Sequence, residues 1–448
     1  MLLGTDISSG SLSSNPIYLT AVGDTLYFQA NDGTNGAELW KSDGTKTGTV
    51  MVKDIRSGSS YSSPTDLTAV DNTLYFQADD GTNGKELWKS DGTSTGTVMV
   101  KDIHSSSDST PQELVAVGNT LYFSADDGTN GRELWKSDGT SSGTVMVKDI
   151  RPGSSYSHPS DLTAVGSTLY FYANDGTNGK ELWKSDGTSS GTVMVKNIRS
   201  GGASSSPTHL TAAGIMLYFQ ADDGTNGKEL WMSDGTVSGT VLVKDINPSS
   251  GESDPDSLTA VDNALYFRAD DGTNGRELWM TSPTNGSTPV ITVMVKDINS
   301  GSGDGDTEYL TAFGNTLYFS ADDGTNGKEL WKSNGTTAGT MMVKDIYSGS
   351  SSSSPEYLTA IGNTLYFRAS DGTNGGELWM SDGTSGGTVL VKDIRPGILS
   401  SSPYDFTATS STFYFQANDG TNGGELWCAE LALGSSGGMS INHAISYI

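Results

Sequence analysis

The chain alternates short runs of β-prone apolar residues with turns rich in Asp, Asn, Ser and Gly. Asp-Gly and Asn-Gly between such runs are strong hairpin signals. No segment combines helical periodicity with capping residues. In the stretch 67–114, used here as the reference repeat, four antiparallel strands are therefore predicted, at residues 67–70, 73–78, 85–89 and 97–103.

This pattern recurs along the whole chain. Its clearest marker is the motif Glu-Leu-Trp, and every tryptophan of the protein lies in a copy of it. Successive tryptophans are 47, 48 or 52 residues apart. They are Trp40, Trp88, Trp135, Trp183, Trp231, Trp279, Trp331, Trp379 and Trp427. Four strands in about 48 residues is the size of a propeller blade. The apolar runs are continuous, which indicates that both strand faces are buried. We predict an all-β, nine-bladed β-propeller of four-stranded antiparallel blades in one domain, residues 1–433, followed by a tail at 434–448.

The two ends of the chain are complementary. Residues 1–7 align without a gap on 49–55, the predicted fourth strand of the first repeat, whereas no fourth strand follows Trp427. We therefore expect residues 1–7 to form the outer strand of the last blade and to remove an exposed edge. Exchange of this strand between subunits, which would build a filament, and an open stack of repeats are the alternatives.

The net charge of the chain limits the classes of partner that it can bind. With 26 Lys and Arg against 53 Asp and Glu, the formal net charge is −27, which disfavours nucleic acid and anionic membranes and favours cations or basic surfaces. The single cysteine, Cys428, excludes an internal disulfide framework and a cysteine-based metal site. No apolar run is long enough for a membrane span, and residues 1–15 lack the features of a signal peptide. Either export uses another route or the chain is a processed piece of a longer product.

One segment of the repeat carries a resemblance. Residues 86–97 read Glu-Leu-Trp-Lys-Ser-Asp-Gly-Thr-Ser-Thr-Gly-Thr, and copies of this pattern begin at Glu38, Glu133, Glu181, Glu229 and Glu377. The chain thus resembles the bacterial ELWxxDGT repeat family. The copies after Trp279, Trp331 and Trp427 depart from the pattern. The resemblance implies a large propeller that is secreted or exposed at the cell surface, without an assigned activity.

A turn of sequence Asp-Gly-Thr-Asn-Gly occurs in all nine repeats. Asp, Asn and carbonyl oxygens are ligands that Ca²⁺ accepts. The alternative is a purely structural turn, in which Asp binds the backbone and Asn and Gly adopt positive φ. The candidate metal ligands, with Ca²⁺ as the candidate cofactor, are Asp32, Asn35, Asp80, Asn83, Asp127, Asn130, Asp175, Asn178, Asp223, Asn226, Asp271, Asn274, Asp323, Asn326, Asp371, Asn374, Asp419 and Asn422.

The tryptophans permit two interpretations, as a set of sugar-stacking platforms or as rings that fill the space between blades. Their mid-strand position favours the second. The histidines, at 104, 158, 209 and 443, occupy non-equivalent places and pair with no nucleophile signature. No catalytic residue is predicted, and the chain is expected not to be an enzyme.

From these features we expect a non-enzymatic extracellular scaffold or adhesion module that presents repeated loops for multivalent contacts with a protein or glycan surface. A carbohydrate- or Ca²⁺-dependent binding protein and a self-associating filament subunit are the alternatives. Two N-glycosylation sequons, at Asn285 and Asn334, lie in predicted turns.

Overall fold

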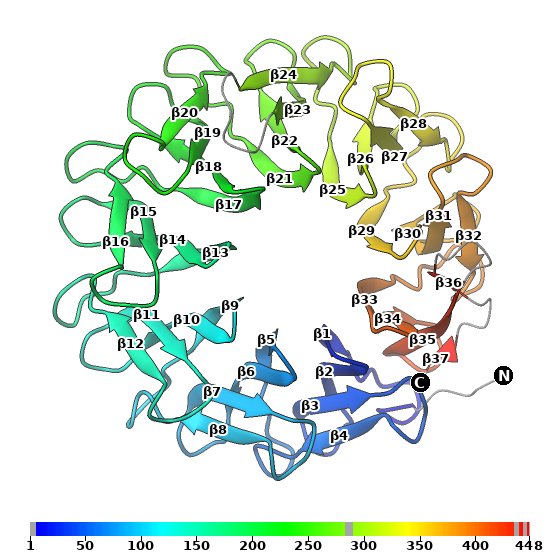
Figure 1. Cartoon of the computed structure of the whole chain (residues 1–448). Helices are drawn as coiled ribbons and strands as arrows, with labels where there is room; N and C mark the ends of the chain where they lie inside the picture. The colour runs from blue at the N-terminus through cyan, green and yellow to red at the C-terminus, as the bar shows by residue number, and fades with distance from the viewer. Residues whose placement is uncertain (1–5, 283–289, 434–438, 442–445, 448) are drawn as a thin grey trace. The chain divides into compact units, whose positions relative to one another are not determined.

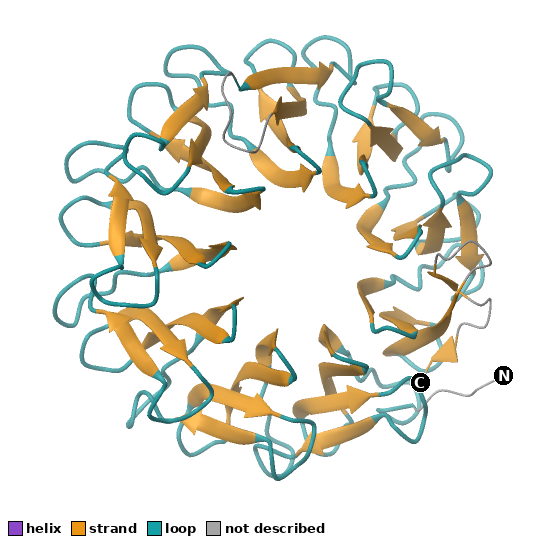
Figure 2. Ribbon diagram, viewed as in Figure 1, coloured by secondary structure: helices purple, strands orange, loops and turns teal. Residues whose placement is uncertain are grey.

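The computed structural model describes residues 6–282, 290–433, 439–441 and 446–447. Every regular element in these ranges is a β-strand, as Figure 2 shows. None of them contains a helix long and apolar enough to cross a membrane.

The strands form nine antiparallel sheets, blades 1 to 9 in chain order (Figure 1). The first strands of the blades are β1 (Ile17–Val22), β5 (Thr65–Val70), β9 (Gln112–Val117), β13 (Ser160–Val165), β17 (Thr208–Ala213), β21 (Asp256–Val261), β25 (Glu308–Phe313), β29 (Glu356–Ile361) and β33 (Tyr404–Ala408).

The second and third strands hold the apolar runs. The second strands are β2 (Thr25–Asn31), β6 (Thr73–Asp79), β10 (Thr120–Asp126), β14 (Thr168–Asn174), β18 (Met216–Asp222), β22 (Ala264–Asp270), β26 (Thr316–Asp322), β30 (Thr364–Ala369) and β34 (Thr412–Asn418). The third strands are β3 (Ala37–Ser42), β7 (Lys85–Ser90), β11 (Arg132–Ser137), β15 (Lys180–Ser185), β19 (Lys228–Ser233), β23 (Arg276–Ser282), β27 (Lys328–Ser333), β31 (Glu377–Ser381) and β35 (Gly424–Leu433).

The fourth strands are short in most blades. They are β4 (Val50–Lys53), β8 (Val98–Lys101), β12 (Val145–Lys148), β16 (Val193–Lys196), β20 (Val241–Lys244), β24 (Ile291–Lys296), β28 (Met341–Lys344) and β32 (Val389–Lys392). In blade 9, β35 instead pairs with two C-terminal strands, β36 (Met439–Ile441) and β37 (Ser446–Tyr447).

The register of each blade explains its apolar runs. In blade 1, Phe28 faces Trp40 and Leu26 faces Ser42 across β2 and β3. Phe28 and Leu26 are fully buried, and the tyrosine between them is 5% exposed. Successive side chains point to opposite faces of a strand, so both faces of β2 are covered, as the continuous apolar runs predicted. The nine four-stranded blades are arranged as a nine-bladed β-propeller, which confirms the predicted fold class.

By their internal contacts the residues form two compact units. Unit 1 comprises Met1–Thr129, Ser137–Val145 and Thr359–Ile448, and unit 2 comprises Asn130–Lys136 and Met146–Leu358. In unit 2, the first strands β13, β17, β21 and β25 are successive neighbours. Apolar clusters join adjacent blades there, such as the one in which Tyr218 and Leu230 of blade 5 pack with Phe267 and Trp279 of blade 6.

Unit 1 brings the first and last blades together. β1 lies against both β33 and β5, and β5 lies against β9. Leu19 and Phe28 share an apolar cluster with Tyr414 and Leu426. The Thr407 hydroxyl donates to the carbonyl of Leu19 at 3.1 Å. Blade 1 therefore packs on blade 9 as it would on any preceding blade.

The edge of blade 9 differs from the expectation. Trp427 and Cys428 pair with Tyr447 and Ser446 of β37, so the C-terminal segment, predicted to be a tail, occupies the place foreseen for residues 1–7. Residues 1–5 lie outside the described residues. The physical reason is that β35 has one free edge, for which either terminus can supply a strand. Ile7 nevertheless lies where the alignment placed it, because its N–H donates to Glu425 as the N–H of Ile55 does to Glu38.

Candidate functional site

The glutamate of each Glu-Leu-Trp motif is a buried anchor for the link between blades. Glu38 is fully buried, and its carboxylate accepts hydrogen bonds from the N–H of Ile55 at 2.9 Å and from the hydroxyl of Ser62 at 2.6 Å. Burial raises the pKa of Glu38 to about 7, although these donors act in the opposite direction. The other blades repeat the anchor, with a glycine, Gly305, in place of the serine in blade 6. The glutamates are Glu86, Glu133, Glu181, Glu229, Glu277, Glu329, Glu377 and Glu425.

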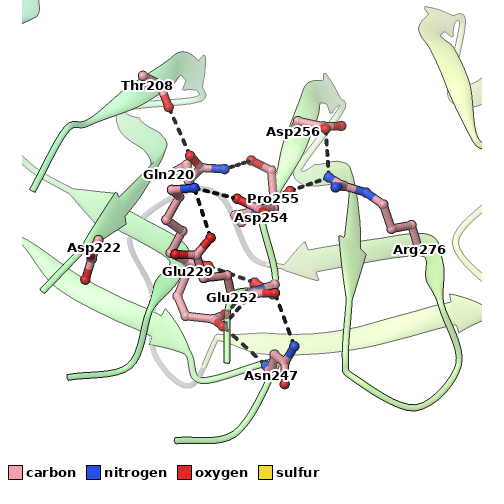
Figure 3. A network of polar contacts seen from close by, with 12 residues as sticks. Thr208, Gln220, Asp222, Glu229, Asn247, Glu252, Asp254, Pro255, Asp256 and Arg276 are labelled. Carbon is pink, nitrogen blue, oxygen red and sulfur yellow. Dashed lines mark hydrogen bonds and ion pairs between the residues drawn. The ribbon is translucent and has the colours of Figure 1, made fainter. Parts of the chain in front are cut away.

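Figure 3 shows this anchor in blade 5. Glu229 accepts the N–H of Asn247 at 3.3 Å, and the amide of Asn247 donates to the carbonyl of Glu252 at 3.1 Å. The link is therefore held by side chains at several points. These glutamates stabilise the fold and are not exposed to a ligand.

The remainder of the motif joins one blade to the next. Lys41 donates to the carbonyl of Gly92 in the following blade at 2.8 Å. A Cβ atom at Gly92 would lie 2.5 Å from the hydroxyl of Tyr27, and its φ is +86°. Gly92 is therefore required both by its conformation and by its neighbour. The tryptophans are also structural: they are 4–8% exposed, which confirms that they fill space between blades.

The predicted metal ligands lie in tight turns that are satisfied internally. Asp32 accepts the N–H groups of Thr34 and Asn35 at 2.9 and 2.7 Å, and its second oxygen accepts the side-chain amide of Asn35 at 2.7 Å. Burial acts in the opposite direction, but these donors lower the pKa of Asp32. Each Asp is thus brought together with the Asn of its own turn. No group of three His, Cys, Asp or Glu side chains suited to a metal occurs among the described residues. Ca²⁺ binding stays a prediction.

In seven blades a second aspartate, just after the fourth strand, has a buried oxygen without a hydrogen-bond partner, and so has Asp6 at the aligned position of the sequence. Oδ1 of Asp54 is one such atom, and the equivalent atoms are those of Asp6, Asp102, Asp149, Asp245, Asp297, Asp345 and Asp393. In blade 4 an asparagine, Asn197, stands at this position. Its amide donates to Oδ1 of Asn178 at 2.9 Å. Oδ1 of Asn197 itself is also buried without a hydrogen-bond partner.

The residues that vary from blade to blade gather at the start of the first strands. The second residue of every first strand is left-handed, with φ between 54° and 60°. None of these nine residues is glycine, which adopts this conformation at least cost, and only the three aspartates among them are of a type that tolerates it well. They are Tyr18, Asp66, Glu113, Asp161, His209, Ser257, Tyr309, Tyr357 and Asp405. We call these nine residues the left-handed set.

Two open grooves lie beside members of this set. In unit 1, a groove of about 410 Å³ between β5 and β9 is lined by Asp66, Leu67, Thr68 and residues 112–115. In unit 2, a groove of about 500 Å³ between β21 and β25 is lined by residues 257–259 and 308–310. Both combine apolar walls with polar side chains, as ligand sites do.

Members of the set also contact the adjacent blade. Oδ2 of Asp405 accepts the N–H of Leu19 at 3.0 Å, and Oδ1 of Asp66 accepts the N–H of Glu113 at 3.3 Å. The rings of Tyr309 and Tyr357 lie 5.7 Å apart, and these side chains are 37% and 41% exposed. The set is therefore ordered yet accessible. The sequence analysis did not identify the left-handed set. The first two residues of each first strand differ among otherwise similar repeats, and this variation could have indicated the set.

The other sequence candidates are dispersed. His158 precedes a first strand and His209 belongs to the left-handed set, whereas His443 lies outside the described residues. Asn334 is exposed in its turn, where its side chain accepts the hydroxyl of Thr336 at 2.7 Å. Asn285 lies in the part that is not described.

No family model and no curated protein matches the chain. Among solved structures, a mutant of puromycin hydrolase in complex with PGG is 14% identical with a TM-score of 0.40, covering 83% of this chain and 58% of that chain. A structure of prolyl endopeptidases is 11% identical with a TM-score of 0.43, covering 92% and 55%. A puromycin-hydrolyzing peptidase of Mycobacterium tuberculosis is 10% identical with a TM-score of 0.39, covering 79% and 58%. The chain spans little more than half the length of these proteins.

These findings contradict the predictions that the chain is not an enzyme and that it is a non-enzymatic extracellular scaffold, with a lectin-like protein and a filament subunit as alternatives. All three structures are of hydrolytic enzymes. The prediction treated repeated architecture as evidence against catalysis, but a fold does not by itself determine which chemistry a protein performs. At identities of 10–14% the likeness itself concerns the fold alone.

Proposed function

We propose that this chain is a recognition domain that binds a polypeptide segment through the left-handed set of its first strands. The observation that carries the proposal is the conformation of these nine residues. A left-handed residue with a Cβ atom costs about 1–2 kcal/mol relative to the right-handed form. Glycine would avoid this cost, and the chain has 57 glycines, but none at these positions.

Strain that persists in the same place in every blade, with a different side chain each time, favours a role for the side chains. The rest of each blade repeats its contacts almost unchanged. The left-handed set is where blades can differ without loss of packing. A ligand that crosses several first strands would therefore meet a different side chain on each.

A polypeptide suits this surface better than a compact small molecule. The β5–β9 groove is open and shallow, and it is continued by the neighbouring strand β1, where Tyr18 is 45% exposed. Its apolar side chains, such as Leu67 and Leu114, alternate with polar ones, such as Gln112. An extended chain presents the same alternation of side chains and backbone amides. We also infer that recognition takes place outside the cell, as the ELWxxDGT resemblance implies.

The test is selection of peptides from a random display library on the purified chain, followed by calorimetry with the selected peptide. Glu113→Gly should weaken binding about tenfold, the equivalent of 1.4 kcal/mol, while the melting temperature should not fall, because the strain at this residue is relieved when the side chain is lost. Ser94→Ala, in an exposed hairpin away from the first strands, is the control and should bind normally. Selected peptides whose affinity no substitution in the left-handed set alters would overturn the proposal.

A further inference from the structure

The aspartates of the left-handed set bind the backbone of the first strand in the next blade. Oδ2 of Asp405 accepts the N–H of Leu19 at 3.0 Å, and Oδ2 of Asp161 accepts the N–H of Leu210 at 3.1 Å. Burial raises the pKa of Asp405, although the N–H groups of Leu19 and Tyr18 act in the opposite direction. Two successive backbone N–H groups therefore face one carboxylate, an arrangement that binds anions.

The junction between β21 and β25 lacks this aspartate. Ser257 stands in β21 where Asp161 and Asp405 stand in their own strands, and its side chain bonds to Asp256. Leu310 is the third residue of β25, and within the described residues no side chain bonds to its N–H. A short hydroxyl thus replaces the carboxylate that the equivalent N–H groups meet at the other two junctions.

The backbone around Leu310 otherwise matches the backbone around Leu19. The carbonyl of Leu310 accepts the hydroxyl of Thr259 at 3.2 Å, and the carbonyl of Leu19 accepts that of Thr407 at 3.1 Å. Both strands shift register between their first and fourth residues. The residue before each leucine is left-handed, with φ of 54° before Leu310 and 60° before Leu19. The N–H of Leu310 is therefore presented as the one that already holds a carboxylate in β1.

An open groove lies beside this N–H. It has a volume of about 500 Å³, and Ser257 and Leu310 are on its two walls. Leu310 is partly exposed, whereas Leu19, which is covered by the neighbouring blade, is buried. A ligand can therefore approach Leu310 from the groove, on the side where Asp405 approaches Leu19.

The charged side chains that begin β21 and β25 are paired with cations. Asp256 binds Arg268 at 2.9 and 2.8 Å and Arg276 at 2.9 Å, as Figure 3 shows for Arg276. Glu308 binds Lys328 at 3.1 Å. These cations reduce the repulsion that the two carboxylates would exert on an anion in the groove. The net charge of −27 repels anions at long range, but physiological salt screens this repulsion beyond about 8 Å.

We propose that the β21–β25 groove binds a carboxylate of the polypeptide ligand on the N–H of Leu310, in the place that an aspartate of the preceding blade takes at other junctions. The inference rests on the proposed function and adds the chemistry of one ligand group. The carboxylate comes from an acidic side chain or from the C-terminus of the ligand, and both present the same two oxygens. The side chains of Leu258 and Leu310 provide apolar surface for its aliphatic part.

The test is NMR of the full chain labelled at the amide nitrogen of leucine, because the bound group is a backbone amide that no substitution removes. N-acetylglycine carries a C-terminal carboxylate, the α-amide of N-acetylglutamate carries a side-chain carboxylate, and the α-amide of N-acetylglutamine carries neither. The carboxylate probes should shift the signal of Leu310, and a response to only one of them identifies the source. The neutral probe should not shift it. The signals of Leu19 and Leu210 are internal controls and should stay in place, since aspartates already bind these amides.

A substitution supplies the missing carboxylate from the chain itself. Ser257→Asp should bind the N–H of Leu310 and abolish its response to the probes, while the melting temperature should not fall. The matched control is Ser238→Asp, which adds the same charge in an exposed hairpin between β19 and β20 and should leave the response intact. Asp405→Ser should create a new response at Leu19.

The inference is overturned if Leu310 does not respond, if Leu19 and Leu210 of the wild type respond equally, or if Ser257→Asp responds as the wild type does. The proposed function fails separately. If peptides from the display library depend on Tyr18 or Tyr357 while Leu310 does not respond, recognition stands and only the carboxylate site is refuted. If Leu310 responds but no substitution in the left-handed set alters any peptide, the site stands and the proposed function is refuted.

Discussion

Replacing Asp54 by asparagine should stabilise the protein. Asp54 stands where blade 4 has Asn197, whose amide donates to Oδ1 of Asn178 at 2.9 Å. In blade 1 the corresponding oxygen of Asp54 is buried and has no partner. Asp54→Asn would add an N–H donor towards Asn35, as Asn197 has towards Asn178, while its amide oxygen stays unpaired like Oδ1 of Asn197.

The magnitude follows from that one bond. A net hydrogen bond contributes ~1 kcal/mol to stability, and the unpaired oxygen is present before and after the change. The change also removes a charge that helps to raise the pKa of Glu38, after the larger effect of burial. We expect ~1 kcal/mol for Asp54→Asn and about 4 kcal/mol when Asp102, Asp149 and Asp245 are changed as well, because the pairs share no partner and should add.

The assay is urea unfolding followed by tryptophan fluorescence, with Asn197→Asp as the reverse variant. Asn197→Asp should lower the free energy of unfolding by the amount by which Asp54→Asn raises it. The reasoning is refuted if the signs are exchanged, with Asp54→Asn destabilising. In that case something other than an amide must satisfy Oδ1 of Asp54, and recovery of the difference by added Ca²⁺ would identify it as a cation.

Four further results are expected. Gly92→Ala should destabilise by more than Gly58→Ala, because both have φ near +87° but only Gly92 has a tyrosine hydroxyl at its Cβ position; equal losses in urea unfolding would exclude the steric cause. Ser14→Ala and Ser62→Ala should each lower the free energy of unfolding by about 1–3 kcal/mol, because each serine hydroxyl donates to a buried carboxylate. Unequal losses would show that the junction of the first and last blades is bonded differently from the other links. Stability should fall as pH rises between about 4.5 and 7, because the raised pKa of Glu38 and its equivalents makes the folded state bind protons more tightly; a melting temperature that rises over this range contradicts the assigned burial effect. EDTA should leave the melting temperature unchanged, since the turn aspartates are already satisfied by N–H donors, whereas a decrease would support the predicted calcium sites.

Strand positions could be predicted because turn chemistry and apolar runs are local properties. The fourth strand of blade 9 could not, because alignment of residues 1–7 with 49–55 shows which segment resembles a strand and not which terminus reaches the edge of β35 first. The anchor glutamates were visible only as repeated letters. Their partners, such as Ser62 for Glu38, lie 24 residues away.

The candidate site was harder still. The Asp and Asn of each turn were predicted to bind a metal because they recur in every repeat. In the structure the repeated residues stabilise the turn. The residue types of the left-handed set vary among the blades. The set is defined by its backbone angle φ, which cannot be read from the sequence. Asp66 and Glu113 follow an ordinary strand pattern in the sequence, and only the structure shows the register irregularities beside them and their place in the lining of the groove. The function was mispredicted for the same reason, because the repeated residues determine the fold of the blades and carry no information about activity.

The bonds between Glu425 and Ser14 have a further consequence. They match those between Glu38 and Ser62 in donor and acceptor, with lengths of 2.9 and 2.6 Å against 3.0 and 2.6 Å, so the junction between the first and last blades has the same chemistry as any other link. A gene permuted to begin at another link should therefore encode the same bonds. New termini could then be introduced beside any chosen member of the left-handed set, for labels or fusion partners.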